Sequence, residues 1–434
     1  MEAFFMKQFT AIVIGAGSRG SRYTDLMGAQ PDKFKVVGVA EPIIDRLNYI
    51  KNKHGVDEAH CFDTWEKILD IPKFADIAII STMDQMHLEP SLKALELGYD
   101  LLLEKPAAIT PEDCGMIYKK AKECGRKVMV CHVLRFSPYF MKLKWILDSG
   151  LLGDVFSIEH LEAVGHVHQS HSFVRGNWGN TGRASFMLLQ KCCHDLDILQ
   201  WLLGKECKRI QSFGSRNHFR IESAPEGAPE RCTDGCPHAD KCYYNAIRLY
   251  YDAKTNAWFR DACAQKPNPT DEEVWHALET TQYGKCVYKC DNDVVDHQTV
   301  NMEFEDGTTV AMTMSAFTRG GRKTHIMGTK GELFCNMDAP ADKAFEFFSF
   351  DARATRYLDS EIATVGDSIT GGHGGGDTGI INALYSYLAG ELKAEDVSEI
   401  GISCRNHMLA FAAEDSRLSG TVISLDDYIS KYMQ

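Results

Sequence analysis

The glycine-rich segment at residues 15–20, Gly-Ala-Gly-Ser-Arg-Gly, constrains the fold of this chain more than any other feature. A β-branched and apolar run at residues 10–14 precedes it, and a helix-like run at residues 21–27 follows. In a strand–turn–helix unit, the first glycine makes the turn, the second lets the backbone approach a pyrophosphate, and the third allows close helix–strand packing. Free N–H groups at the helix start favour an anion. The pattern predicts a dinucleotide-binding turn whose cofactor contacts include Gly15, Gly17, Ser18, Arg19 and Gly20.

A second predicted strand, residues 35–40, ends at Glu41, which lies 21 residues after Gly20. A carboxylate at this position accepts hydrogen bonds from the adenosine ribose hydroxyls and repels a 2′-phosphate. Glu41 therefore predicts NAD as the cofactor. Arg46 lies nearby and keeps NADP open as an alternative, because an arginine accommodates the 2′-phosphate.

Strands and helices continue to alternate after this unit. Further strands are expected at residues 75–81, 100–103 and 127–132, with a helix ending at Leu97 and another at residues 111–124. The alternation predicts a doubly wound parallel sheet, whose ligands bind beyond the carboxyl ends of the strands. The residues expected at those ends are Glu41, Thr82, Glu104 and His132.

Composition narrows the class of protein further. The chain has 434 residues and a formal net charge of −13, so we expect neither nucleic acid nor an anionic membrane surface as a partner. No stretch approaches the ~18 to 20 apolar residues that span a bilayer. The first residues lack the pattern of a signal peptide. Fifteen cysteines without a secretory signal are typical of reduced thiols, which predicts a cytoplasmic protein.

Several motifs occur in a recognisable order along the chain. The glycine turn and Glu41 are followed by a Thr82-x-x-x-x-His87 loop, by Glu104-Lys105-Pro106, and by Arg135-Phe136-Ser137-Pro138. A segment at residues 188–204 then contains His194. This order resembles the glucose–fructose oxidoreductase / inositol dehydrogenase (Gfo/Idh/MocA) family, and the resemblance implies that residues 188–204 form the family's catalytic helix.

The resemblance implies a fold and a domain division. An NAD-binding Rossmann domain is expected at residues 1–133. An α/β domain with a large, mostly antiparallel open sheet is expected at 134–434, where it binds substrate and forms homodimers or homotetramers. Residues 215–290 are expected to be an insertion. A hairpin is predicted from residues 294–304 and 308–315 around Glu305-Asp306-Gly307.

The resemblance also implies the residues of a site. Lys105 and His194 correspond to the family's catalytic pair, and Pro106 suits a cis peptide bond that aims the lysine. Gln190 stands where the family often carries aspartate. Asp195 or Asp197 is then the expected orienter of His194, or both lie only on the surface of the helix. Further cofactor contacts are expected from Thr82, His87, Glu104, Lys105 and Arg135. Substrate contacts are expected from His166, His168, Arg175, Trp178, Gln190 and Lys191.

Two other segments carry candidate ligands. Cys232, Cys236 and Cys242 follow a C-x3-C-x5-C spacing and suggest a structural zinc site, with His238, His218 or Cys263 as a fourth ligand. Plain reduced cysteines in a loop are the alternative. The glycine-rich run at residues 371–377 precedes a helix-like segment, and His373 within it either reaches the active site or lies on a surface loop.

Three functions fit these features. The first is hydride transfer between NAD and a hydroxyl of a sugar, cyclitol or other polyol. The second is an NAD-dependent glycosidase or lyase, which oxidises a sugar carbon transiently and returns the hydride, and the departure at Gln190 keeps it open. The third is an NAD-sensing regulator without catalysis, against which Lys105 and His194 argue.

Overall fold

The first domain contains a six-stranded, wholly parallel sheet. The computed structural model describes residues 7–254, 256–358 and 373–433. The strands follow the spatial order β3-β2-β1-β4-β5-β6 and are β1 (Phe9–Ile14), β2 (Phe34–Ala40), β3 (Cys61–Phe62), β4 (Ile77–Ile80), β5 (Asp100–Leu103) and β6 (Val128–Val130). They are short and almost wholly buried, as expected for strands covered on both faces. The predicted doubly wound sheet is confirmed.

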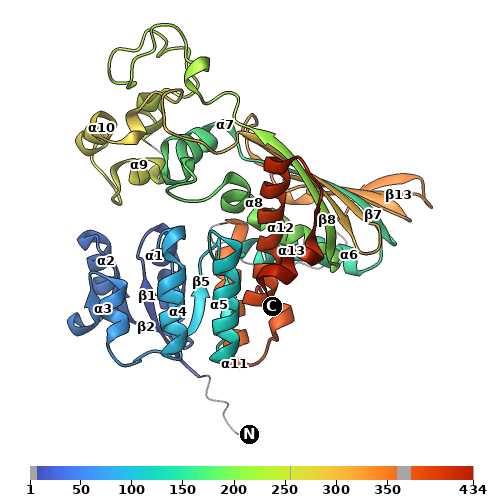
Figure 1. Ribbon diagram of the computed structural model, residues 1–434, viewed down its shortest axis with the longest axis horizontal. Coiled ribbons are helices and arrows are strands. Elements are labelled where there is room, and N and C mark those ends of the chain that lie inside the picture. Colours follow the sequence, from blue (N-terminus) through green and yellow to red (C-terminus); the bar gives the residue numbers. More distant parts are fainter. Residues whose placement is uncertain (1–6, 255, 359–372, 434) are drawn as a thin grey trace.

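Helices cover both faces of this sheet (Figure 1). One face packs against α1 (Ser18–Gly28), α2 (Ile44–His54) and α11 (Gly376–Ala389). The other packs against α3 (Trp65–Asp70), α4 (Leu88–Glu96) and α5 (Pro111–Glu123). The helix α11 comes from the far end of the chain, so the first domain is completed by a segment that sequence reasoning placed in the second.

The second domain is built on a nine-stranded sheet of order β14-β13-β12-β11-β7-β10-β9-β8-β15. Its strands are β7 (Val155–Ala163), β8 (Cys207–Ser215), β9 (His297–Phe304), β10 (Thr309–Ser315), β11 (Gly321–Gly328), β12 (Gly331–Asn336), β13 (Phe345–Ser349), β14 (Ala354–Tyr357) and β15 (Ile423–Ser424). Neighbours are antiparallel except β7 and β10, which run parallel. The large, mostly antiparallel sheet is therefore confirmed, and β9 and β10 form the predicted hairpin.

Helices join the two domains. The helices α6 (Pro138–Asp148), α8 (Met187–Leu203) and α12 (Ile400–Ser419) share one apolar core with the first domain. The helix α12 also packs beside α5, and α13 (Leu425–Tyr432) follows it. In Figure 1, α12 stands at the junction of the two domains. Among the described residues, no helix combines the length and apolar character needed to cross a bilayer.

The insertion between β8 and β9 is a small helical lobe. It contains η6 (Ile221–Ser223), η7 (Ile247–Asp252), α9 (Ala257–Ala264), α10 (Asp271–Thr280) and η8 (Gln282–Gly284). Two apolar clusters of its own hold it together, and side chains from the segment α7 (His166–His168) to η4 (Gln169–Arg175) pack against them. Figure 1 places this lobe above the carboxyl ends of the parallel strands.

Candidate active site

The three glycines of the turn between β1 and α1 are needed for different reasons. Gly15 has a φ of 86°, and a Cβ there would lie 2.6 Å from the carbonyl oxygen of Ser81. A Cβ on Gly20 would lie 2.0 Å from the carbonyl oxygen of Gly15. Around Gly17 the space is open, with Nη1 of Arg46 the nearest atom at 3.9 Å. Gly15 and Gly20 therefore serve the turn itself, whereas Gly17 leaves room for a ligand.

The N-terminus of α1 suits an anion in that open space. Its N-cap is Gly17, no side chain caps its free N–H groups, and its first turn contains no acidic residue. Uncapped N–H groups and the helix dipole both attract phosphate oxygens. The turn therefore fits the pyrophosphate of a dinucleotide.

Glu41 is held at this turn by the backbone. One carboxylate oxygen accepts a hydrogen bond from the N–H of Ala16 at 2.6 Å, and the other accepts from the N–H of Ile43 at 3.0 Å. The side chain is only 4% exposed, so its orientation is set by these two bonds. Arg46 lies beside Gly17, so the structure brings both the NAD-type carboxylate and the NADP-type arginine to the glycine turn.

Arg19 faces the protein rather than the open space. Its Nε donates to Glu104 at 2.8 Å, and its Nη2 donates to Asp377 at 2.8 Å. Tyr23 also donates to Glu104, at 2.6 Å. Burial alone raises the pKa of Glu104, but Arg19 and Lys105 outweigh it and hold that pKa below its usual value. Arg19 thus ties the glycine turn to the end of β5 and to the start of α11.

His87 contacts two loops at the edge of the parallel sheet. Its Nδ1 lies 2.8 Å from the carbonyl oxygen of Pro106, and its Nε2 lies 3.2 Å from that of Thr82. The ring is buried, and the Thr82 hydroxyl donates to the carbonyl of Met86. His87 therefore positions the Lys105-Pro106 turn, where the peptide bond is cis as expected.

The side chain of Lys105 reaches the helix α8, which carries His194. The Lys105 ammonium donates to the backbone carbonyl of Gln190 at 3.0 Å, one helical turn before His194. His194 is 7% exposed and its Nδ1 has no hydrogen-bond partner. Burial lowers the pKa of His194 well below its ordinary value, and the neighbouring charges of Lys105 and His132 lower it further. The arrangement places a neutral imidazole beside an ammonium group.

Two neighbours of this pair come from distant parts of the chain. The side-chain amide of Gln190 donates to Asp84, which lies in the short helix η2 (Asp84–Met86), and to Ser185 at 2.9 Å. The ring of His373 lies 6.3 Å from that of His194, so His373 lies beside the candidate site. Gly371 and Gly372 lie outside the described residues.

The expectation that Asp195 or Asp197 orients His194 is wrong. Asp195 is bound by Nε2 of His160 at 3.0 Å and by Nε of Arg322 at 2.7 Å. Asp197 accepts two hydrogen bonds from Arg135, at 2.6 and 2.7 Å. Both carboxylates are buried, so each requires a cationic partner more strongly than His194 requires an acceptor.

This pairing also accounts for Arg135. Its guanidinium is buried against Asp197, not directed to the open space above Gly17. In the structure Arg135 therefore belongs to the packing beneath the site.

On the substrate side, Lys191 and His168 lie near each other. Lys191 is 3.3 Å from Glu162, which also pairs with Arg322 at 2.8 Å. Burial, followed by the charge of Lys191, lowers the pKa of His168 to about 2. His168 packs against Trp258 of the insertion at 5.2 Å between ring centroids. The charge of Lys105 also acts on His168, so these polar groups lie within electrostatic reach of Lys105.

The remaining expected substrate residues lie further from this group. His166 packs against Tyr243 and Tyr244 of the insertion, and Trp178 packs against Phe173. Arg175 is 1% exposed and donates to the backbone carbonyl oxygens of Lys285 and Tyr244. The structure therefore does not bring Arg175 to the Lys105–His194 pair.

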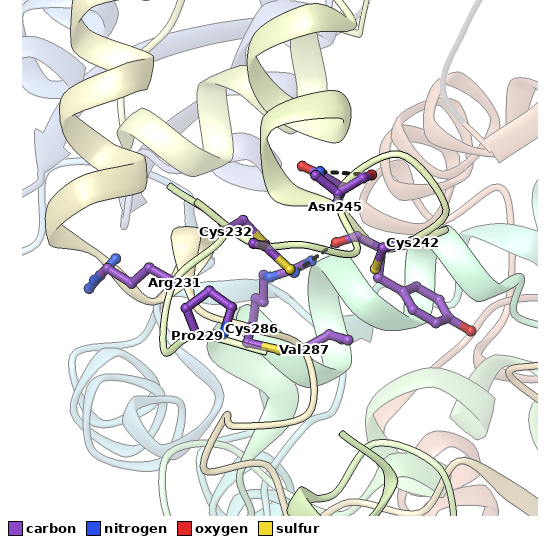
Figure 2. A pocket seen from close by; sticks show the side chains of 11 residues that line it. Pro229, Arg231, Cys232, Cys242, Asn245, Cys286 and Val287 are labelled. Carbon is purple, nitrogen blue, oxygen red and sulfur yellow. Dashed lines mark hydrogen bonds between the residues drawn. The ribbon is translucent and has the colours of Figure 1, made fainter. Parts of the chain in front are cut away.

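The expected zinc site is not supported. Across the described ranges, no three Cys, His, Asp or Glu side chains converge closely enough to hold one metal ion. None of the suggested fourth ligands, His238, His218 and Cys263, lines the cavity that Cys232, Cys236 and Cys242 share with Cys286 (Figure 2). His238 instead lies 2.8 Å from the carbonyl oxygen of Glu226. The three residues are close in sequence, but their thiols are not placed to share one metal ion.

Sequence reasoning missed four residues of the site or of its supports: Asp84, Glu162, Arg322 and Asp377. Asp84 lies inside the Thr82–His87 loop, so the loop motif could have indicated it. Arg322 on β11 and Glu162 on β7 meet only because these strands are neighbours in the sheet. No local sequence pattern predicts such a pair.

A parallel sheet with an open glycine turn, and a lysine and histidine at its carboxyl edge, define a two-domain enzyme fold that binds a dinucleotide. Residues 9–132 match the model described as "Oxidoreductase family, NAD-binding Rossmann fold", and residues 144–354 match that family's C-terminal alpha/beta domain. The chain belongs to the Gfo/Idh/MocA family of oxidoreductases.

Three relatives show the range of functions near this chain. "Putative oxidoreductase YteT" of Bacillus subtilis is 23% identical over 83% of this chain and 81% of its own length. Inositol 2-dehydrogenase of Salmonella typhimurium is 23% identical, over 47% of this chain and 57% of its own length. The 2,7-anhydro-N-acetylneuraminate hydratase of Escherichia coli is 28% identical, over 33% of this chain and 37% of its own length. The match covers more than two thirds of the first relative's length but less than two thirds of the other two.

Solved structures match the whole fold. An aldose-aldose oxidoreductase from Caulobacter crescentus, complexed with glycerol, has a TM-score of 0.66 and 14% identity, and the match covers 96% of this chain and 100% of that one. An inositol dehydrogenase homolog from Azotobacter vinelandii, complexed with NAD+, has a TM-score of 0.67 and 15% identity, with 97% and 98% covered. At these identities the likeness shows the fold.

Proposed function

We propose that this protein transfers a hydride between NAD and a hydroxyl of a sugar, cyclitol or other polyol. The observation that carries the proposal is the neutral, unpartnered His194 beside the Lys105 ammonium, at the edge where parallel sheets bind their ligands. Bound NAD supplies the hydride acceptor for alcohol oxidation.

The chain's own residues handle the substrate proton. The Lys105 ammonium is a hydrogen-bond donor that stabilises negative charge developing on the substrate oxygen. A ring nitrogen of His194 accepts the hydroxyl proton, because burial and Lys105 keep the imidazole neutral. Gln190 and Asp84 hold the first turn of α8 in place, and His168 and Lys191 offer polar contacts to further hydroxyls. His166, which packs against Tyr243 of the insertion, and Trp178, which packs against Phe173, are proposed as outer substrate contacts.

A second candidate is the redox-neutral reaction, in which NAD is reduced and reoxidised in each turnover. Two observations support it. Gln190 cannot exchange a proton where the family often carries aspartate, and a relative is named a hydratase, which denotes no net oxidation. Burial also raises the pKa of Glu162, beside Lys191, which makes it a candidate proton donor.

A substrate screen separates these functions. The purified full chain is incubated with NAD and a panel of sugars, cyclitols and glycosides, while NADH absorbance and product release are followed together. Net NADH formation supports the dehydrogenase. Product without NADH supports the redox-neutral enzyme, and an absence of both, with NAD bound, supports a regulator.

A lysine variant tests the proposed residues. Lys105→Met is expected to lower kcat by about 10²- to 10⁴-fold, the usual contribution of a positioned proton-transfer or charge-stabilising group. Lys93→Met, on the exposed surface of α4, is the matched control and should retain the wild-type rate. Equal rates in the two variants would remove Lys105 from the mechanism.

A further inference from the structure

Four cysteines of the insertion line one cavity, apart from the site described above. Cys232, Cys236 and Cys242 come from a single loop, and Cys286 comes from a later segment (Figure 2). Arg231 and Lys285 form an antiparallel bridge that brings the two segments together. The backbone N–H of Cys232 donates to Gly284 at 2.9 Å, and that of Cys286 donates to Glu230 at 2.8 Å.

A buried arginine lies against this cavity. Arg175 is 1% exposed, donates through Nε to Lys285 and through Nη2 to Tyr244, and approaches the sulfur of Cys232 at 3.8 Å. Its Nη1 is buried and has no hydrogen-bond partner. In the part of the chain that the structure describes, no carboxylate pairs with it. An uncompensated buried cation destabilises the folded state by several kcal/mol, so a negatively charged group in the cavity stabilises the fold.

The cysteines provide that charge only when they are deprotonated. A cysteine thiol has an ordinary pKa of about 8.5 and is therefore mostly neutral at physiological pH, which leaves Arg175 uncompensated. Coordination to a metal keeps cysteines as thiolates.

Hydrogen bonds to sulfur support a thiolate at Cys232. Its Sγ accepts from the backbone N–H of Ala246 at 3.4 Å, as well as from Arg175. Donors of this kind surround metal-bound thiolates, where they stabilise the charge on sulfur and tune the metal.

The geometry argues against a Cys232–Cys286 disulfide and against a single ion. Gly284 lies opposite Cys232 across the bridge, so Cys286 is its diagonal neighbour, at a typical Cα separation of about 7–8 Å. A disulfide does not span more than about 7 Å between Cα atoms. As noted above, no three of these side chains are close enough to share one ion. Iron–sulfur clusters use four cysteines but distribute them over separate iron atoms.

We propose that Cys232, Cys236, Cys242 and Cys286 bind an iron–sulfur cluster whose negative charge is offset by Arg175. Arg175 ends the segment η4, which follows directly on His168. A cluster in this cavity therefore links the insertion to the segment from α7 to η4, which contains the proposed substrate contact His168.

Metal analysis tests this proposal without any assay of activity. The full chain is produced in iron-supplemented cells and purified without oxygen, and iron, acid-labile sulfide and zinc are measured per chain. Iron and sulfide in equal amounts are expected, with thiolate-to-iron absorption in the visible range that bleaches on reduction. Zinc in place of iron, or no iron and sulfide after anaerobic reconstitution with both, would overturn the proposal.

Two ligand variants and a matched control complete the test. Cys236→Ser and Cys286→Ser are each expected to lose most of the iron. Cys263→Ser alters a buried cysteine of the same insertion that does not line the cavity, and it should keep the wild-type iron content. Far-UV circular dichroism and NAD binding report whether each variant is folded. Folded ligand variants with as much iron as the control would refute the assignment.

Discussion

At the scale of single residues, the site depends on a missing side chain and on a missing hydrogen-bond partner. Gly17 lacks a side chain where the start of α1 is open, and His194 lacks a partner for a buried ring nitrogen. The glycine was evident from its spacing in the sequence. The orphaned nitrogen was not, because Asp195 and Asp197 are near His194 in sequence and yet bind Arg322 and Arg135.

Gly17→Asp is expected to separate stability from cofactor binding. The position has an ordinary φ of −68° and open space, and aspartate is a favoured N-cap. Its carboxylate occupies the anion site and repels the pyrophosphate. We expect an unchanged or higher Tm with at least about a tenfold weaker Kd for NADH, about 1.4 kcal/mol. Gly17→Ala is the control with a smaller effect, and undiminished NADH binding by the aspartate variant would contradict this placement of the cofactor.

The pH dependence of the oxidation rate is a second residue-scale prediction. Burial and Lys105 hold the pKa of His194 well below its ordinary value of 6.5. The imidazole therefore stays neutral as the pH falls from 8 to 6.5, and the acid limb of kcat is expected below pH 6.5. A pH series of the initial rate with saturating substrate and NAD measures it. An acid limb centred above pH 6.5 that disappears in His194→Asn would show that His194 is charged near neutrality.

At the scale of elements, the helix α8 has polar residues on several faces, and each face meets a different neighbour. Gln190 and His194 lie toward Lys105, Asp195 lies toward β7 and β11, and Asp197 lies toward Arg135. Almost the whole helix is buried, so each polar side chain is fixed by its neighbour. Helical periodicity predicts which residues share a face. The partner that meets each face depends on the packing of distant segments.

Asp197→Asn is expected to destabilise the protein by about 3 kcal/mol, because it leaves the Arg135 charge buried without its counter-ion. Burial raises the pKa of Asp197, but Arg135 and His132 outweigh it and keep that pKa below its ordinary value. The contribution of the pair is thus complete at pH 7 and is lost only as the pH falls through the folded-state pKa.

Urea unfolding at pH 7 measures this difference. Asp148→Asn breaks the exposed i,i+4 pair with Lys144 and is the control, with an expected loss below about 0.5 kcal/mol. Similar losses in the two variants would show that the buried pair contributes no more than a surface pair.

At the scale of the whole molecule, the two domains share their stability. The helix α11 covers one face of the parallel sheet, and α12 packs against α5 and α8. The backbone of Val130, in β6, also donates to Ser398 at 2.8 Å. The Rossmann domain therefore depends on residues far beyond the boundary at 133 expected from sequence.

Leu384→Ala tests this dependence. Leu384 is 1% exposed in the core between α11 and the sheet, and its truncation is expected to cost about 2–5 kcal/mol. NADH binding reports on the first domain, and tryptophan fluorescence reports mainly on the second. Both urea transitions should move together, while Asn382→Ala, exposed on the same helix, should move neither. Loss of NADH binding at an unchanged fluorescence midpoint would show that the domains unfold independently.

Features that depend on neighbouring residues could be predicted from the order of amino acids. The glycine turn, the alternation of strands and helices and the β9–β10 hairpin follow from local backbone geometry and side-chain periodicity, and the helix carrying His194 followed from the family resemblance. Three-dimensional packing was needed to show which charges pair, that α11 completes the first domain, and that Cys286 joins three cysteines of another loop. These contacts join residues tens to hundreds of positions apart, and their energies come from burial, which no local pattern contains.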